Sequence, residues 1–237
     1  MDRLKILTIK VLSSILRKME FRYNQIMSKS IKLGQRGMGC IFEYPSVIGN
    51  PSQVYLHDFT RLQRNHKILN YTGKFVMKEY SAAAINLTVV TGNHTPTVGI
   101  PQYLSGPSHV NDRETDVIVE EDAWLGTNVT LIAGAHIGRG AVVGAGSIVN
   151  KDIPPYAIVV GVPAKIVGVK FSIEQILKHE QILYPENKRF SKKYLESLFN
   201  TCFEGKKVLG VDGELSPKDN DKLKQVIDTM HFKYLNS

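Results

Sequence analysis

The chain has 237 residues, 43% of them apolar and 22% charged, and this composition predicts a globular protein with a substantial core. Two cysteines are too few for a disulfide framework or a cysteine metal cluster, and no apolar run approaches the roughly 18 residues of a membrane span, so a reducing cytoplasm fits best. Residues 1–32 carry +6 of the net charge of +8, with eight basic and two acidic side chains. The rest of the chain therefore has little excess positive charge, which argues against nucleic acid as a partner of the main body.

The first expected element is a helix over residues 3–27. Leu4, Leu7, Val11 and Ile15 recur every three or four places, and lysine and arginine lie elsewhere around the helix. The simplest interpretation is a helix packed on its own protein. The alternative left open is peripheral contact with a membrane surface or a lipid-linked acceptor, because basic amphipathic helices bind such surfaces.

From Val119 the sequence has a period of six. Cut into sixes it reads VEEDAW, LGTNVT, LIAGAH, IGRGAV, VGAGSI and VNKDIP, with Val, Leu or Ile always first and a mostly small residue fifth. Neither an α-helix nor an ordinary strand has this period, whereas a prism with three short strands per coil stacks equivalent residues every 18 places. The sequence therefore predicts a mainly β fold, the left-handed parallel β-helix, with the first and fifth residues inside.

Before this region the register is weaker. Two units are expected to start at Ile48 and Val54, and two more from Val76, although Met77 then takes a place where glycine is common. Residues 95–116 fit no register at all. A loop this long inside a regular solenoid is expected to be either functional or disordered.

The pattern changes again at Phe171. Helical spacing predicts three helices, in the segments FSIEQILKHEQIL, FSKKYLESLF and SPKDNDKLKQVIDTMH, the first with Ser172 as its N-cap. This tail is expected to cover the open end of the solenoid, where backbone groups lack partners, or to pack on a neighbouring subunit. The chain is thus divided into an N-terminal helical segment 1–35, a β-helix 36–170 and a helical tail 171–237.

The loop that fits no register begins with TGNHTPTVG, so His94 stands where the chain leaves the coil. An imidazole at that point can face outward beside the loop, and its usual titration range suits general-base work at neutral pH. From position alone, an ordinary surface histidine is the alternative.

The stretch WLGTNVTLIAGAHIGRGAVVGAGSIVNKDIPPYAIVVGVPAKIVG resembles the hexapeptide-repeat acyltransferases, specifically the maltose/galactoside O-acetyltransferase and xenobiotic acetyltransferase group. The resemblance covers residues 41–170 and is strongest over 117–168. TVVTGNH is similar to the family segment that ends in the catalytic histidine, which implies that role for His94. The family also implies a cytoplasmic homotrimer that binds acetyl-CoA as acyl donor between adjacent β-helices and requires no metal.

The same resemblance implies where acetyl-CoA binds. Trp124 falls on the family's tryptophan, and as the sixth residue of its unit it should face outward, to line the cleft or to pack between subunits. Thr127 and Ala145 match positions beside the pantetheine arm, where a small residue lets an extended chain lie against the coil.

Three more positions match the family's contacts with the nucleotide end of CoA. Asn150 and Lys151 fall near the adenosine, although the family often has threonine where Asn150 stands. Lys165, in GVPAK, matches a basic residue near the phosphates. For each lysine, an ordinary solvated side chain is the alternative.

The resemblance implies direct acetyl transfer to a sugar or saccharide hydroxyl, and the long loop, basic helix and tail favour a surface-polysaccharide precursor built on a lipid carrier, at the inner membrane. N-acetyl transfer to an amino sugar or a xenobiotic stays open, although the tail lacks the tryptophans of the xenobiotic branch. A non-catalytic β-helix scaffold is a second alternative. A metal site as in γ-type carbonic anhydrases, from His94, His109 and His136, is disfavoured because no pair has that family's coil spacing.

Overall fold

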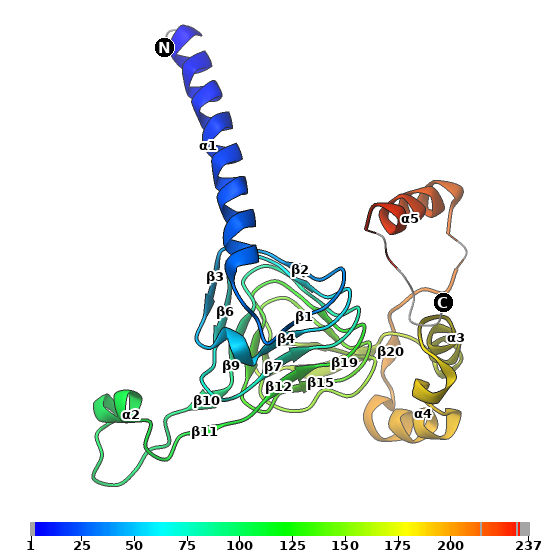
Figure 1. Cartoon of the computed structure of the whole chain (residues 1–237). Coiled ribbons are helices and arrows are strands. Elements are labelled where there is room, and N and C mark those ends of the chain that lie inside the picture. The colour runs from blue at the N-terminus through cyan, green and yellow to red at the C-terminus, as the bar shows by residue number, and fades with distance from the viewer. Residues whose placement is uncertain (1–2, 214, 231, 233–237) are drawn as a thin grey trace.

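The computed structural model describes residues 3–213, 215–230 and 232, with the side chains of the first helix described from Ile9 onward. Its centre is a three-sided prism of short strands, with one strand on each side in every coil (Figure 1). Over residues 35–160, strands that are neighbours on a side of the prism come from successive coils. The predicted parallel β-helix, preceded by one helix and followed by several, is confirmed.

The three sides are named sheets A, B and C in the order in which each coil passes through them, and edges AB, BC and CA join them. Sheet A consists of β1 (Gln35–Arg36), β4 (Val54–Leu56), β7 (Phe75–Met77), β12 (Val117–Val119) and β15 (His136–Ile137). Sheet B consists of β2 (Ile41–Phe42), β5 (Arg61–Leu62), β8 (Ala82–Ala83), β13 (Trp124–Leu125), β16 (Val142–Val143), β18 (Ala157–Val160), β19 (Lys165–Val169) and β20 (Lys207–Val208). Sheet C consists of β3 (Ser46–Ile48), β6 (His66–Leu69), β9 (Thr88–Val90), β14 (Thr130–Ile132) and β17 (Ile148–Val149), and a 3-10 turn, η1 (Pro51–Gln53), follows the first coil.

The interior of the prism is filled as the period of six predicts. Residues 18 apart pair in parallel in successive coils, as Trp124 does with Val142. The first residues of the six units are Val119, Leu125, Leu131, Ile137, Val143 and Val149, and the fifth are Ala123, Val129, Ala135, Ala141, Ser147 and Ile153; all are at most 3% exposed. Stacked aliphatic side chains and hydrogen bonds between coils therefore hold this part of the fold together.

In the earlier coils the expected unit start at Ile48 is confirmed, since Ile48 pairs with Ile68 in the column that leads to Leu131. The starts at Val54 and Val76 are wrong, by two places and one place. Val76 is only half-buried, whereas Phe75 and Met77 on either side of it are fully buried, so Met77 is a core residue. Val54 is also buried, but Leu56 is the residue that pairs with Met77. Leu56 and Met77 are 21 residues apart, and these longer coils shift the phase that 18-residue coils would have kept.

Two edges are built from residues with positive φ. Edge BC repeats this in four coils, at Asn65, Asn86, Asn128 and Gly146, with φ between 59° and 72°. Asparagine and glycine tolerate the left-handed region best, which explains their recurrence at this corner. On edge AB, Gly140 has φ 69°, and a Cβ there would lie 2.6 Å from the Tyr156 ring.

Helix α1 (Arg3–Ser30) projects away from the prism (Figure 1). Only its last turns are attached, because the Ser28 hydroxyl donates to the Phe42 carbonyl, and the Tyr23 and Tyr44 rings meet edge to face at 5.8 Å. The interpretation of this helix as packed on its own protein is wrong for most of its length, where apolar side chains are exposed. None of the described helices is long and apolar enough to cross a membrane.

The tail forms the helices that its spacing predicts. They are α3 (Ile173–Leu183), α4 (Lys192–Leu198) and α5 (Pro217–Met230), with the short turns η2 (Glu186–Lys188) and η3 (Phe199–Phe203) between them. The Ser172 side chain accepts a hydrogen bond from the Gln175 N–H in a full capping box, which confirms the predicted N-cap. At the end of sheet B, β19 pairs antiparallel with β18 and β20 extends the sheet, so strands rather than helices cover those backbone groups.

One buried carboxylate ties the tail to the prism. Glu180 of α3 is fully buried and accepts hydrogen bonds from the Tyr156 hydroxyl at 2.7 Å, from Arg139 Nη1 at 2.9 Å and from the Phe190 N–H at 3.2 Å. Arg139 also reaches Glu121 at 3.3 Å. A buried charge is stable only when it is paired and hydrogen-bonded in this way, so these contacts fix α3 against edge AB.

A buried histidine in the second coil predicts how stability depends on pH. His66 is fully buried against Phe42; its Nδ1 lies 2.9 Å from the Gln63 carbonyl, and its Nε2 has no partner among the described residues. Loss of solvation lowers the pKa of His66 to about 4. As the pH falls, the unfolded chain therefore binds a proton at His66 at a higher pH than the folded chain does. The contribution of His66 to the unfolding free energy is complete above the usual histidine pKa of about 6.5 and is lost as the pH falls toward 4.

We expect this site to remove about 3 kcal/mol of unfolding free energy between pH 7 and pH 4. The measurement is urea unfolding at several pH values, for the natural chain and for His66→Gln, which cannot titrate. The difference in unfolding free energy between the natural chain and His66→Gln should become smaller as the pH falls. Parallel curves would show that His66 is not buried as a neutral ring.

Candidate active site

The segment that interrupts the repeat is an ordered arm at edge CA. Its two ends, β10 (Gly92–Asn93) and β11 (Arg113–Glu114), pair antiparallel, and α2 (Gln102–Ser108) lies beyond them (Figure 1). The Glu114 carboxylate fastens the arm to the preceding coil by accepting from the N–H groups of Tyr71, Thr72 and Gly73. Partial desolvation raises the pKa of Glu114, but these three donors outweigh it and leave the pKa lowered, so the anchor is ionised at neutral pH.

His94 stands just after β10 and faces a carboxylate from the returning side of the arm. Its Nδ1 lies 3.0 Å from Asp112 Oδ2 and 3.2 Å from Oδ1. Desolvation raises the pKa of Asp112, but hydrogen bonds from His109 and His94 more than compensate, and the net pKa is lowered. An ionised Asp112 fixes the proton of His94 on Nδ1 and leaves the Nε2 lone pair for chemistry.

On the opposite side of the His94 ring, Nε2 faces Gly106 of α2, where an added Cβ would be in van der Waals contact with Nε2 at 3.7 Å. The missing side chain of Gly106 leaves space beside Nε2. The His94 side chain is 47% exposed, so an acceptor can reach Nε2 from solvent. Base, orienting carboxylate and access are therefore all present on one arm.

A second histidine shares the same carboxylate. His109 Nδ1 lies 2.9 Å from Asp112 Oδ2, and the two imidazole rings are 5.8 Å apart. His109 caps α2 with φ 51° and stacks on Tyr71, with ring centroids at 5.2 Å and planes 10° apart. Through Asp112, this stacked ring helps to hold the carboxylate in place against His94.

The same three groups could hold a metal ion. In the described part of the chain, His94, His109 and Asp112 offer ligand atoms within 4.8 Å of one another. His136, the third histidine of the carbonic-anhydrase alternative, does not join them. It lies in β15 of sheet A, where its Nε2 is 2.7 Å from Glu120 Oε1. Within one chain, these three histidines therefore do not come together.

Five of the six residues expected to contact acetyl-CoA lie at or beside two edges. Thr127 and Ala145 stack in successive coils at edge BC, where the Gly146 N–H donates to the Thr127 carbonyl at 2.8 Å. A Cβ on Gly126 would lie 2.6 Å from the Ala145 nitrogen, so the coils approach closely here. Lys165 is exposed in the next coil beside this edge, directly after Ala164, whose N–H donates to Ile148 of sheet C.

The other three residues lie elsewhere. Asn150 and Lys151 are exposed at edge CA, after β17, on the same side of the prism as the arm with His94. Trp124 is on the outer face of sheet B, between Ala82 and Val142 in the adjoining strands, and its side chain is 44% exposed, as expected from its sixth place. Within one chain, His94 is therefore separated from Thr127 and Ala145 by the width of sheet C.

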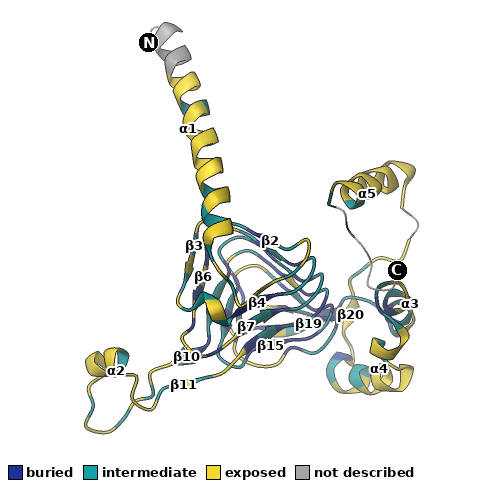
Figure 2. Cartoon of the chain, in the orientation of Figure 1, coloured by how far each residue is buried: buried dark blue, intermediate teal, exposed yellow. Residues whose placement is uncertain are grey.

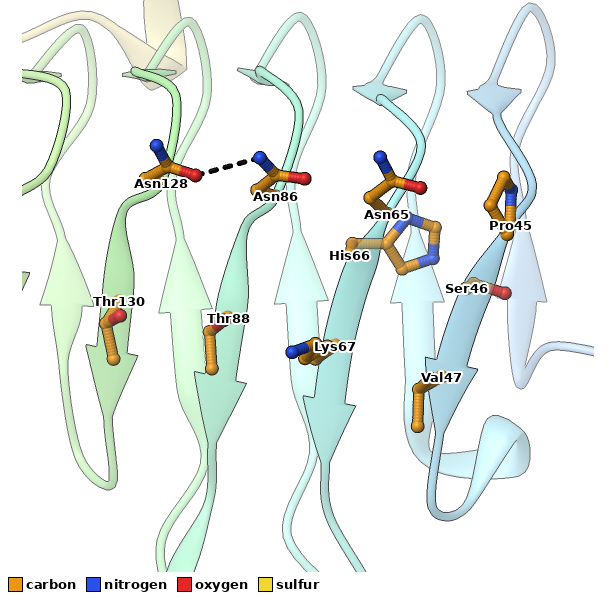
Figure 3. Close-up of a pocket in the computed structure, with 10 residues that line it drawn as sticks. All are labelled: Pro45, Ser46, Val47, Asn65, His66, Lys67, Asn86, Thr88, Asn128 and Thr130. Carbon is orange, nitrogen blue, oxygen red and sulfur yellow. Dashed lines mark hydrogen bonds between the residues drawn. The ribbon is translucent and has the colours of Figure 1, made fainter.

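Sheet C carries a polar hollow of about 580 Å³ between these two edges (Figure 3). One row of side chains comes from edge BC, where Asn86 Nδ2 donates to Asn128 Oδ1 at 2.9 Å. A second row follows the strands themselves. The outward residues of the first row are Asn65, Asn86 and Asn128. Those of the second row are Val47, Lys67, Thr88 and Thr130. Amide, hydroxyl and ammonium groups of this kind suit a hydrogen-bonding ligand.

Asp112 was not expected from the sequence as part of the site, and His109 was considered only as a ligand of the disfavoured three-histidine metal site. The sequence shows NDRETD as a charged run at the end of a loop, with no periodicity to set its direction. Only the antiparallel pairing of Asn93 with Arg113 brings position 112 back beside position 94. The one available signal was an acidic residue near the far end of a loop that begins with a histidine.

Residues 116–151 match the bacterial transferase hexapeptide family, described as six repeats. A maltose O-acetyltransferase from Clostridium difficile 630 shares the fold with a TM-score of 0.55 at 19% identity, over 72% of this chain and 90% of that chain. The chain is a hexapeptide-repeat protein. A hexapeptide-repeat acetyltransferase of Vibrio cholerae O1 biovar eltor, solved in complex with acetyl-CoA, is also similar to it, with a TM-score of 0.54 at 21% identity over 67% of this chain and 89% of that one.

Curated relatives match this hexapeptide-repeat protein over a shorter stretch. The chloramphenicol acetyltransferase of Morganella morganii is 44% identical over 64 residues, which is 27% of this chain and 30% of that protein. The chain thus aligns with less than a third of that relative's length. Because this likeness spans only 27% of the chain, the helix α1, the arm and the tail are interpreted from their own residues.

Proposed function

We propose that this hexapeptide-repeat protein is an acetyl-CoA-dependent O-acetyltransferase that acts on a hydroxyl of a sugar or saccharide, with His94 as general base. The observation that carries the proposal is the pairing of His94 Nδ1 with Asp112 at 3.0 Å, on an arm at the prism edge where the His94 side chain is 47% exposed. Acetyltransferases with this fold, one of them solved with acetyl-CoA, support the choice of donor.

The reaction needs one proton carrier and no covalent enzyme intermediate. His94 Nε2 takes the proton of the acceptor hydroxyl while the hydroxyl oxygen attacks the thioester carbonyl of acetyl-CoA. The tetrahedral intermediate collapses to the acetyl ester and expels the CoA thiolate, which receives the proton from Nε2. Asp112 stabilises the imidazolium between these two steps, because its carboxylate stays ionised and bonded to Nδ1.

The division of the site between two edges supports a homotrimer with active sites between chains. Edge CA of one chain carries His94, Asn150 and Lys151, and edge BC carries Thr127 and Ala145. Three prisms around a threefold axis can bring edge CA of each chain to edge BC of the next, and such a ring closes. Acetyl-CoA would then lie along Thr127 and Ala145 of one chain, with its thioester at the neighbour's His94.

The polar hollow on sheet C supports a hydroxyl-rich acceptor. It lies beside edge BC, and its lining is dominated by asparagine, threonine and lysine side chains (Figure 3). Such groups donate to and accept from sugar hydroxyls, whereas an aromatic drug would need apolar walls. This chemistry favours a saccharide over an apolar xenobiotic.

The test measures release of CoA thiol from acetyl-CoA, with and without candidate sugars and amino sugars. We expect release to depend on a sugar acceptor, the product to be an alkali-labile ester, and a chelator to leave the rate unchanged, because the proton transfer uses Asp112 and no metal. An alkali-stable amide would identify an N-acetyltransferase instead. Absence of thioester cleavage with every acceptor would favour the scaffold alternative, and loss of activity with the chelator would make His94, His109 and Asp112 metal ligands.

A further inference from the structure

Helix α1 exposes apolar side chains along most of its length. It stands clear of the prism, and most of its described residues carry the colour of exposed residues in Figure 2. The contacts that hold it are near its C-terminal end, at Tyr23 and Ser28 and through Arg36, whose Nη2 donates to the Ser28 carbonyl at 2.8 Å. A large apolar surface that no described residue of the chain covers marks an interaction site in a folded protein.

Apart from Val11 and Phe21, which are 53% and 63% exposed on other faces of the helix, these apolar side chains form one continuous stripe. They follow one another at intervals of three and four residues, which places them on one face of an α-helix. Each is between 54% and 66% exposed: Ile9, Leu12, Leu16, Met19, Tyr23 and Ile26. Ile15, which is 49% exposed, widens the stripe on one side.

Basic side chains border this stripe. With 3.6 residues per turn, Lys18, Arg22 and Lys29 lie along the side of the stripe next to Ile15, and Lys10 and Arg17 lie on the polar face beyond its other side. Glu20 is the single acidic residue over positions 9–29, against five basic ones. The surface around the stripe is therefore strongly cationic.

We propose that α1 docks on the anionic surface of a lipid bilayer. The apolar stripe enters the boundary between headgroups and acyl chains, with the helix lying in the plane of the surface, and the lysines and arginines contact lipid phosphates. This charge complementarity, rather than the apolar face alone, identifies the occupant. The proposal does not depend on acetyl transfer or on the nature of the acceptor.

Association of α1 with second copies of itself fits the charges less well. The same spacing of three and four would suit a coiled coil, with Arg22 and Lys29 beside the seam on one side and Ser13, Glu20 and Met27 on the other. In a parallel coil Arg22 would face Met27 of the partner, so no opposite charges would meet. Each added copy would also bring five more basic side chains beside those of its neighbours.

The experiment is co-sedimentation of the full chain with vesicles. The vesicles are phosphatidylcholine alone, or phosphatidylcholine mixed with phosphatidylglycerol, each at low and high salt. We expect binding to the anionic vesicles only, and less binding at high salt. Replacing Lys18 and Arg22 with glutamine should weaken binding about 30-fold, since each basic residue near the surface contributes about 1 kcal/mol.

A matched pair of variants separates the stripe from the net charge. Leu16→Asp places a carboxylate in the stripe and should abolish sedimentation, whereas Ser14→Asp makes the same change of charge on the polar face and should retain most of it. Size-exclusion chromatography with light scattering reports whether either variant alters assembly. The proposal would be overturned if the chain bound neutral and anionic vesicles equally, or if the two variants had equal effects. It would also be overturned if Leu16→Asp dissociated the assembly while the natural chain did not bind vesicles at all.

Discussion

Replacing His94 with alanine should lower kcat by about a hundred- to ten-thousand-fold while leaving CoA binding unchanged. The alanine variant cannot take the acceptor proton, so the hydroxyl would have to attack the thioester without a base. His94 lies on the arm, away from Thr127 and Ala145 of the same chain, and its loss should not alter the surface on which the donor rests. The measurements are acceptor-dependent release of CoA thiol and, separately, calorimetric titration with CoA.

The chain offers a matched control for this variant. His136 is 45% exposed and also pairs with a carboxylate, Glu120, at 2.7 Å, but it lies on sheet A. His136→Ala should leave kcat near that of the natural chain. Asp112→Asn should lower kcat less than His94→Ala does, because the base remains but loses the charge that stabilises its protonated form. Equal turnover in the natural chain and His94→Ala would remove His94 from the mechanism.

The β-helix could be predicted because its constraint is strictly periodic. Each unit from Val119 onward places one aliphatic residue where it must stack on its equivalent in the next coil, and six units without an insertion make that visible in the letters alone. The earlier coils obey the same rule, but with 21 residues from Leu56 to Met77 the phase is lost. A fixed period of six then assigns Val76 to the interior of the prism, although Phe75 and Met77 are the residues that fill it.

The candidate site was predictable only in part. His94 could be found because it ends a coil and opens the loop, and its neighbours in the chain carry the resemblance. The partnership with Asp112 depends on a pairing across the arm, which no periodicity encodes. For α1, the spacing predicts the helix but not what covers it, because the same stripe suits a protein core, a bilayer or a second copy. The exposure of this stripe in the folded chain argues against a protein core.

The two-edge arrangement of the site predicts that two inactive variants can restore activity to each other. Ala145→Trp should block the pantetheine path on edge BC while leaving the fold intact, because Ala145 is exposed. A chain with Ala145→Trp still has His94, and a chain with His94→Ala still has an open edge BC. When the two are co-expressed in equal amounts and assemble at random, about a quarter of the sites between chains combine an intact base with an intact donor surface.

Thiol release by the mixed assembly should therefore recover to roughly a quarter of the natural rate, far above that of either variant alone. A chain with both substitutions, mixed with His94→Ala, should recover nothing, since no base remains in any site. Recovery of activity requires that His94 of one chain act on acetyl-CoA bound at edge BC of the next chain. If the mixture stayed as inactive as its components while light scattering showed mixed assemblies, each site would have to be complete within one chain. His94 would then have to reach across its own sheet C to Thr127 and Ala145, which the position of the arm at edge CA opposes.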